Sequence, residues 1–300
     1  MEMRQLQMFV TLAGELNFTR TAERLNTVQS NVTSHMRHLE EELGVRLFDR
    51  YPRRLVMTEA GTQFLPYAQR VLATVEEAQR TMRFGQEPAG PLRIGAPESI
   101  VTYRLPPALR RFRQRHPDVM LMLRPYVDWP LAQPLQNGEF DLAIRIADVI
   151  TEKTLGSRRI GAERIVLVAA PEYPLGQRAT IRPADLSGQH LLLTEEGCAY
   201  RKKLERIVHS RAIRPQSVGE FASVEAIKQC AILGMGIALL PEIVVASEIK
   251  SGTLKVLPWR GPDLSMSTHV VWHKDRSMTP AMRGFLDTLD ETPARRVRRL

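Results

Sequence analysis

Three residues near the N-terminus have a spacing that strongly limits what this segment can fold into. Ala22 belongs to one short helical pattern, Asn26 follows four residues later, and Val32 lies six residues further on in a second helical pattern. A small residue lets two helices cross closely, and asparagine is one of the few non-glycine residues that tolerates a positive φ. The spacing therefore predicts two helices joined by a tight turn and anchored by Val32.

The flanking residues predict a further helix before this pair and a small hairpin after it. Apolar residues recur at helical spacing over 6–16, and a stripe over 32–43 marks the buried face of the second helix of the pair, which Gly44 ends. Over 45–58 the apolar residues alternate around a turn that contains Pro52, which is typical of a hairpin. Helix, turn, helix and hairpin together predict a winged helix-turn-helix.

The solvent-facing side of the second helix carries short polar side chains, which can reach the edges of bases in a DNA major groove. Glutamine suits adenine, and arginine suits guanine or phosphate. Arginines in the hairpin turn could contact phosphates or the minor groove. A polar face that is merely solvated is the alternative. We expect double-stranded DNA as a partner, with contacts from Gln29, Ser30, Thr33, Ser34, Arg37, Arg53 and Arg54.

A long helix with an apolar seam is predicted to follow the hairpin. Thr58 can cap this helix, and Glu59 suits its first turn. Steps of four and three separate the seam residues, a pattern that favours pairing with a second copy of the chain, although packing within one chain is the alternative. The seam consists of Phe64, Ala68, Val71, Val75, Ala78 and Met82. The glycines and prolines of 85–91 predict a domain boundary.

Beyond residue 91, predicted strands alternate with predicted helices, which indicates an α/β fold with a largely parallel sheet in two lobes. Strands are expected over 92–96, 119–123, 141–146, 163–170, 190–195, 217–221, 236–240, 253–257 and 267–273. Helices are expected over 103–115, 130–137, 199–210, 223–233 and 279–290. A ligand would bind between the lobes, at the carboxyl ends of the strands.

Residues at those strand ends are therefore candidates for binding a small molecule. Hydroxyl groups and free amides at a helix start, with an arginine nearby, would suit a small anion or carboxylate. Capping of a helix is an equally good explanation for Ser223. The candidates are Ser99, Ile100, Thr102, Arg145, Thr194 and Ser223.

The charge and cysteine content agree with a cytoplasmic, nucleic-acid-binding protein. The net charge is +9, which favours a polyanionic partner, although residues 1–58 contribute only +1 (eight Arg against seven Asp or Glu). The N-terminus lacks the pattern of a signal peptide, and no stretch reaches ~18 consecutive apolar residues, so neither export nor membrane insertion is expected. Two cysteines without a C-x-x-C pair predict neither a disulfide framework nor a zinc site.

An enzyme on the α/β domain is the main competing hypothesis. The sequence contains no G-x-S-x-G, P-loop, H-E-x-x-H or strand-linked G-x-G-x-x-G motif, and its seven histidines show no metal-ligand spacing. We therefore expect no catalytic residue, no metal and no cofactor. A solute-binding transport protein would fit residues 90–290, but it would explain neither the first 84 residues nor the missing signal peptide.

Residues 9–32 read FVTLAGELNFTRTAERLNTVQSNV, and LEEELGVRLFDR at 39–50 and MTEAG at 57–61 follow. These motifs resemble those of the LysR-type transcriptional regulators, and the match is densest here. GPLRIGA, RLPPALRRF, GEFDLAI and GMGIALLP extend the resemblance over 90–290. Thr21, Ser30 and Ser34 depart from the commoner pattern, so the operator sequence cannot be inferred from relatives.

The resemblance implies a winged helix-turn-helix over 1–58, a dimerising linker over 59–89 and an effector-binding domain over 90–300 that is similar to periplasmic binding proteins. Lobe I would comprise about 91–161 and 268–292, and lobe II about 162–267. It also implies tetramers on interrupted palindromes near promoters. If effector binding closes the lobes, the DNA bend would change and favour contact with RNA polymerase.

The alternative within this family is a thiol-based redox sensor. Cys198 is similar in place to the peroxidatic cysteine of the peroxide-sensing branch, and Arg201, Lys202 and Lys203 could lower its pKa. The resolving cysteine expected about nine residues later is missing, since His209 and Ser210 occupy that region. Cys230 shares an apolar face with its neighbours and is expected in the core.

Overall fold

A computed structural model describes residues 1–51, 54–84, 87–126 and 130–290. Arg53 and the basic run at 295–299 lie outside these residues. The chain forms two compact units: Met1–Gln86 with Gln133–Glu139, and Glu87–Ala132 with Phe140–Leu300. The expected class is confirmed, with an N-terminal winged helix-turn-helix, a long helix and a two-lobed α/β domain.

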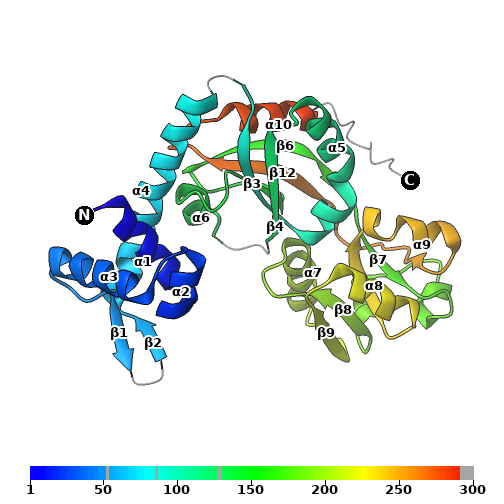
Figure 1. Ribbon diagram of the computed structural model, residues 1–300. Helices are drawn as coiled ribbons and strands as arrows, with labels where there is room; N and C mark the ends of the chain where they lie inside the picture. Colours follow the sequence, from blue (N-terminus) through cyan, green and yellow to red (C-terminus); the bar gives the residue numbers. More distant parts are fainter. Residues whose placement is uncertain (52–53, 85–86, 127–129, 291–300) are drawn as a thin grey trace. The chain divides into compact units, whose positions relative to one another are not determined.

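The first unit packs three short helices, a hairpin and a long helix around one core (Figure 1). The Phe9 ring lies at its centre, 5.6 Å from the Phe48 ring and 5.2 Å from the Phe64 ring. These rings join the first helix, the hairpin and the long helix in one apolar cluster. The elements are α1 (Met3–Glu15), α2 (Phe18–Arg24), α3 (Gln29–Leu43), β1 (Phe48–Tyr51), β2 (Arg54–Met57) and α4 (Glu59–Phe84).

The turn between α2 and α3 has the geometry that the sequence predicts. Asn26 adopts a φ of 49°, Ala22 is buried where the two helices meet, and Val32 is fully buried. Thr21 is also buried, and its hydroxyl donates to the Asn17 carbonyl at 2.8 Å, so this polar side chain is paired inside the close crossing. The helix-turn-helix is therefore confirmed at the level of its determining residues.

The long helix α4 begins as expected at a threonine cap. The Thr58 hydroxyl accepts a hydrogen bond from the Gly61 backbone N–H at 3.0 Å. The seam enters the core only at its start: Ala68 is buried, whereas Val71 is 40% exposed and Met82 is 83% exposed. The C-terminal part of the seam thus remains uncovered within one copy of the chain.

The second unit contains two five-stranded sheets, one in each lobe (Figure 1). Lobe I has the strand order β4-β3-β5-β12-β6, and lobe II has the order β11-β7-β10-β8-β9. The strands are β3 (Gly90–Ala96), β4 (Val119–Pro125), β5 (Leu142–Ala147), β6 (Leu155–Glu163), β7 (Ile165–Ala169), β8 (His190–Thr194), β9 (Ser217–Phe221), β10 (Ile237–Pro241), β11 (Lys255–Val256) and β12 (Met266–His273).

Helices cover both sheets, and α8 and α7 lie on opposite faces of the lobe II sheet. The helical segments are η1 (Ile100–Arg104), α5 (Pro106–Arg115), α6 (Ala132–Gln136), η2 (Pro174–Gln177), η3 (Pro183–Leu186), α7 (Ala199–Ser210), α8 (Val224–Ile232), η4 (Glu242–Val244), α9 (Ala246–Ser251) and α10 (Pro280–Asp290). No described helix is long and apolar enough to cross a membrane.

The expectation of largely parallel sheets is wrong, because each sheet is half antiparallel. In lobe I, β3 pairs in parallel with β4 and β5, but β12 runs antiparallel to β5 and β6. In lobe II, β8 is parallel to β9 and β10, whereas β7 is antiparallel to β10 and β11. The antiparallel pairs arise where the chain passes between lobes: Arg164 alone separates β6 from β7, and β12 returns to lobe I.

Several element boundaries also differ from the sequence prediction. The helix expected over 103–115 begins instead at Pro106, whose ring favours the first helical position, and a π-helical turn, η1, precedes it. Strand β6 and helix α9 were not predicted, because neither has a clear apolar period. The strand expected over 163–170 is divided between the end of β6 and β7.

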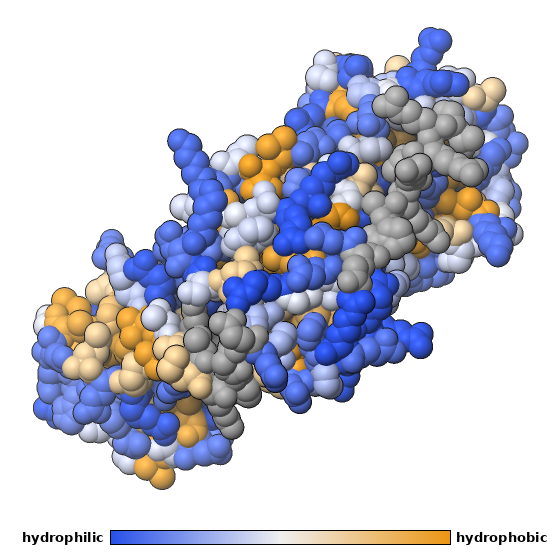
Figure 2. Space-filling view, turned by 90° about the horizontal axis from the view of Figure 1, so that it is seen from above, coloured by the Kyte–Doolittle hydropathy of each residue, from blue (hydrophilic) through white to orange (hydrophobic). Residues whose placement is uncertain are grey.

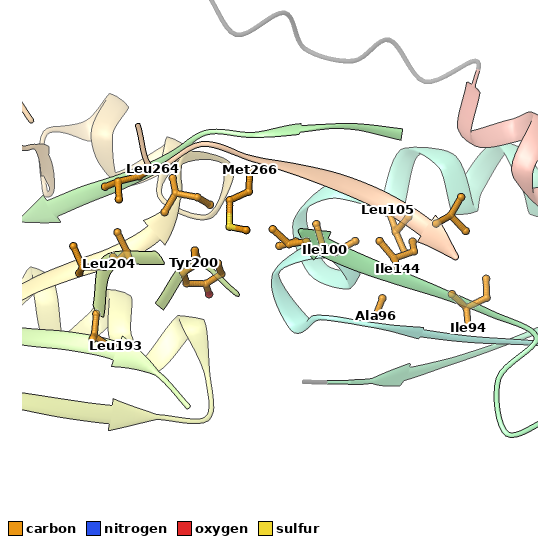
Figure 3. Close-up of a cluster of buried hydrophobic side chains, with 14 of the residues drawn as sticks. Ile94, Ala96, Ile100, Leu105, Ile144, Leu193, Tyr200, Leu204, Leu264 and Met266 are labelled. Atoms are coloured by element: carbon orange, nitrogen blue, oxygen red, sulfur yellow. The ribbon is translucent and has the colours of Figure 1, made fainter. Parts of the chain in front are cut away.

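The two lobes share one hydrophobic cluster, which Figure 3 shows in part. Ile94, Ile144 and Leu105 belong to lobe I, while Leu193 and Leu204 belong to lobe II. Ile100 and Tyr200 lie on the sides that face each other. On the face of the protein drawn in Figure 2, hydrophobic residues form small separate patches within a mostly hydrophilic surface.

Candidate functional site

The polar residues predicted to read DNA lie together on the solvent side of α3. Gln29, Ser30, Ser34 and Arg37 are exposed and Thr33 is half-buried. Their spacing along the helix places them on one face, where they line a shallow groove. We call these five residues the reading face.

Local hydrogen bonds order part of the reading face. The Thr33 hydroxyl donates to the Gln29 carbonyl at 3.0 Å, and the Thr19 hydroxyl donates to Gln29 Oε1 at 3.3 Å. Arg37 Nε donates to Glu41 Oε1 at 2.7 Å, but both side chains are exposed. An exposed pair of this kind stabilises the helix little, so Arg37 can exchange Glu41 for a phosphate or a base.

The wing is the antiparallel hairpin of β1 and β2. Arg54 is exposed and pairs with Tyr51 in the ladder, so it lies in a strand and not in the turn that the sequence predicted. Its guanidinium group lies 5.0 Å from the centre of the Tyr51 ring, a cation–π contact that holds the side chain on the wing. The other arginine predicted here, Arg53, lies outside the described residues.

Sequence reasoning missed two further arginines, Arg46 and Arg50. Both are exposed, and together with Thr33 and Arg37 they line a second groove between α3 and the wing. The Arg50 guanidinium group lies 4.9 Å from the centre of the Phe18 ring. Their place in the first half of the predicted hairpin, directly after the predicted reading helix, was a signal that could have identified them.

In the second unit, a cavity of about 110 Å³ lies between the lobes. We call it the interlobe cavity. The carboxyl-terminal part of β5 and the segments at the carboxyl ends of β3, β4 and β8 form much of its wall, as the strand-end rule predicts. The lining residues are Pro97, Glu98, Ser99, Pro125, Tyr126, Leu131, Ile144, Arg145, Ile146, Thr194, Glu195, Cys198, Ala199, Tyr200, Phe221, Ala222 and Val224.

The structure brings only half of the predicted effector residues into this wall. Ser99, Arg145 and Thr194 line the cavity. Ile100 and Thr102 do not: the side chain of Ile100 is buried in the core, and that of Thr102 is exposed to solvent. Both residues belong to η1, the π-helical turn that directly follows Ser99.

Ser223 acts indirectly, through a glutamate from the other lobe. The Ser223 hydroxyl donates to Glu98 Oε1 at 3.2 Å, and the Val224 backbone N–H donates to Glu98 Oε2 at 3.0 Å. The Glu98 carboxylate of lobe I therefore caps α8 of lobe II. The sequence prediction of free amides at this helix start is wrong for Val224, whose amide Glu98 already occupies.

The one arginine in the wall is also occupied. Arg145 Nη1 donates to Glu152 Oε1 at 2.5 Å. Although burial raises the pKa of Glu152, the hydrogen bond and charge of Arg145 together with backbone hydrogen bonds outweigh burial, and the pKa lies below its ordinary value. Glu152 is therefore ionised, and it neutralises Arg145.

A second polar link joins the lobes beside the cavity. The Tyr103 hydroxyl donates to Glu225 Oε2 at 3.0 Å, and Lys228 Nζ lies 2.7 Å from Glu225 and 3.0 Å from Glu248. Burial lowers the pKa of Lys228, but the hydrogen bonds with both glutamates raise it by more in total. The pKa therefore lies above its ordinary value, and Lys228 is charged. Tyr103 on η1 is thus bound to an ion-pair network of lobe II.

Cys198 does not have the environment of a reactive thiol. Burial raises the pKa of Cys198 above its ordinary value. The expectation that nearby cations lower it is wrong for two of the three: Arg201 binds Glu205 and Glu220, and Lys203 Nζ donates to the Ser265 carbonyl at 2.7 Å. Cys230 packs against the lobe II core as expected.

The cavity contains residues that the sequence did not identify, above all Glu98, Glu195, Tyr200 and Phe221. Glu98 lies two residues after the end of β3 and could have been found by the strand-end rule. Tyr200 lies in a predicted helix, where an aromatic residue indicates only a core position. Among the residues that the structure describes, no group of three or more His, Cys, Asp or Glu side chains could hold a metal ion.

Comparisons with known proteins agree with both regions. Residues 3–62 match the bacterial regulatory helix-turn-helix protein, lysR family, and residues 85–294 match the LysR substrate binding domain. The chain is 41% identical to the HTH-type transcriptional regulator YwqM of Bacillus subtilis over 97% of this chain and 99% of that protein.

Two solved structures have the same fold. Full-length OxyR from Pseudomonas aeruginosa is 25% identical, with a TM-score of 0.72 over 96% of this chain and 94% of that chain. Full-length CbnR in complex with its target DNA is 22% identical, with a TM-score of 0.68 over 96% of this chain and 99% of that chain.

Proposed function

Because the chain belongs to the LysR family of transcriptional regulators, we propose that it binds operator DNA sequence-specifically and controls transcription in response to a small effector. The observation that best supports DNA binding is the reading face, in which five side chains lie on one exposed side of α3: Gln29, Ser30, Thr33, Ser34 and Arg37. A helix of this kind fits the major groove, which is about 12 Å wide.

Within this proposal, the side chains divide into two groups. Gln29, Ser30, Thr33 and Ser34 contact base edges, since their donors and acceptors are short and exposed. Arg37 contacts a base or a phosphate. Arg46, Arg50, Arg53 and Arg54 contact phosphates or the minor groove, because the wing follows α3 directly in the chain.

The parts of the chain take separate roles in the proposal. Residues 1–58 bind DNA, 59–89 pair two copies, and 90–300 bind the effector. The exposed seam residues of α4, such as Val71 and Met82, support pairing, since an apolar stripe at heptad spacing is stable in water only when covered. Two dimers would form a tetramer on an interrupted palindrome.

The interlobe cavity is the proposed effector site, with Ser99, Arg145 and Thr194 in its wall and Ser223 acting through Glu98. Residues of both lobes line the cavity, so a ligand there can bias their closure. Closure would alter the DNA bend and the contact with RNA polymerase in the cytoplasm. We assign no catalytic role to any residue. The thiol sensor is not favoured, because burial raises the pKa of Cys198.

Duplex binding by the purified full-length chain tests the proposal. Fluorescence anisotropy would compare fragments from the region upstream of its own gene with shuffled duplexes of equal length, at two salt concentrations. We expect at least tenfold tighter binding to one upstream fragment, and an affinity that falls steeply with salt for all duplexes. Equal affinity for upstream and shuffled duplexes would contradict the proposal.

A further inference from the structure

The charges around the interlobe cavity indicate the chemical class of its ligand, on the premise that this cavity is the proposed effector site. We propose that it binds a small organic amine, with the ammonium group facing Glu98 and Glu195 and the apolar body against the aromatic wall. This differs from the anion that the strand-end residues alone suggested.

The two features that could bind a carboxylate are both occupied by carboxylates of the chain itself. Glu98 accepts the Val224 N–H and the Ser223 hydroxyl at the start of α8. Glu152 binds Arg145, the sole arginine or lysine among the lining residues. An anionic ligand would have to displace one of these glutamates and would meet the negative charge of the other.

The remaining charged group of the wall is a carboxylate with no cation of its own. Glu195 lines the cavity, and within the described ranges its carboxylate makes no hydrogen bond or ion pair. The lining therefore carries Glu98 and Glu195 against one arginine that is already neutralised. A cation placed between two carboxylates in a confined, poorly solvated site is held more strongly than in water.

The rest of the wall favours an apolar body attached to that cation. Tyr126, Tyr200 and Phe221 contribute aromatic rings, and Ile144, Ile146 and Leu131 contribute aliphatic surface. Aromatic faces attract ammonium groups, and more strongly when the pair is desolvated. Burial is the main cause of the raised pKa of Tyr200, and the charge of Glu98 contributes to it in the same direction.

The available space limits the ligand to a small molecule. An apolar protein cavity of about 150 Å³ accepts benzene. The interlobe cavity has about 110 Å³ and is only partly enclosed, so a single ring or a short branched chain with one amino group is the largest ligand that we expect it to accept. Benzylammonium, benzoate and benzyl alcohol share one ring and differ in charge, which makes them matched probes.

Titration calorimetry of the full-length chain with these three probes tests the inference. We expect benzylammonium to bind at least tenfold more tightly than benzoate or benzyl alcohol. Glu195→Gln should weaken benzylammonium binding at least fivefold, whereas Glu196→Gln, a change at the exposed neighbour outside the lining, should leave it unchanged. Glu98→Gln should also weaken benzylammonium binding, and it should reduce the ratio between the affinities for benzylammonium and benzoate.

Three results would overturn the inference. The first is tighter binding of benzoate than of benzylammonium, and the second is no binding of benzylammonium up to about 20 mM, a concentration at which a weakly binding fragment is detected. The third is equal binding of all three probes, with affinities that Glu195→Gln leaves unchanged. Glu195→Gln removes no contact within the described residues, so it tests the inference even if Glu98→Gln fails to fold. Binding of upstream DNA by the same preparation separates the two claims. If DNA binding persists without amine binding, this inference fails and the proposed function stands.

Discussion

The Glu40 carboxylate accepts a hydrogen bond from the Leu47 backbone N–H at 2.8 Å, which ties α3 to the wing. The same oxygen accepts the Phe48 N–H at 3.2 Å. Leu47 and Phe48 are buried, so these two N–H groups have little access to water. The Glu40 side chain on α3 therefore fixes where the wing begins.

Replacing this carboxylate should destabilise the first unit. Glu40→Ala leaves buried N–H groups unpaired, which costs about 1–3 kcal/mol. Glu41→Ala is the matched control, since Glu41 lies next to it on α3 and loses only an exposed pair with Arg37. Urea unfolding of both variants measures the free energies. An equal loss in the two variants would contradict the role of Glu40.

The turn at Asn26 should tolerate glycine and reject a β-branched residue. Its φ of 49° is left-handed, a region that costs about 1–2 kcal/mol for a residue with an ordinary side chain. Asn26 is exposed, so its substitution creates no cavity. We expect the free energy of unfolding of Asn26→Gly to lie within about 0.5 kcal/mol of the wild-type value. That of Asn26→Val should be lower than the wild-type value by more than about 1 kcal/mol. Equal stabilities, measured by thermal denaturation, would exclude this strain.

The α4 seam should control assembly. Val71→Glu places a charge in the proposed interface twice, once from each copy, and removes two valines that each contribute roughly 1.5–3 kcal/mol when buried. Thr74→Glu introduces the same charge at an exposed position beside the seam. Sedimentation velocity should show that only Val71→Glu weakens dimerisation, by at least about tenfold. A dimer that survives Val71→Glu would place the interface elsewhere.

The thiol of Cys198 should titrate at high pH. Since burial raises its pKa in the folded chain, the neutral thiol is favoured by folding. Its contribution to stability is therefore complete below the unfolded pKa of about 8.5 and is lost as the pH rises through the folded value. The rate at which iodoacetamide labels Cys198 in a Cys230→Ser background measures this titration. Mass spectrometry would follow the labelling from about pH 6 to about pH 10, a range that brackets the unfolded thiol pKa. Half-maximal labelling below the ordinary thiol pKa would restore the redox hypothesis.

The winged helix-turn-helix could be predicted from the sequence because its determinants are local. Ala22, Asn26 and Val32 act within one turn and its two helices, and Thr58 caps the helix that it precedes. Each of these residues has a restricted choice of type for a steric or hydrogen-bonding reason. Their spacing therefore carries the geometry directly.

The interlobe cavity could be predicted only in outline, because its charges depend on contacts between distant segments. Glu98 and Val224 are far apart in the chain, and only the folded domain brings them together. The same holds for the antiparallel strands β6 and β12, whose pairing follows from the passage of the chain between lobes. Ile100 was misplaced because no periodicity in the sequence indicates a π-helical turn.

Sequence-specific recognition through α3 is the central claim, and the binding of one variant pair to the mapped operator tests it most directly. Fluorescence anisotropy would compare Gln29→Ala with Arg54→Ala on the operator and on its single-base-pair variants. Arg54→Ala should weaken binding to all duplexes alike and reduce the salt slope by about 0.9. Gln29→Ala should lose about 1–3 kcal/mol of binding free energy on the operator. It should also bind equally well to operators that differ at the one base pair that Gln29 contacts. An unchanged base preference in Gln29→Ala would contradict the account.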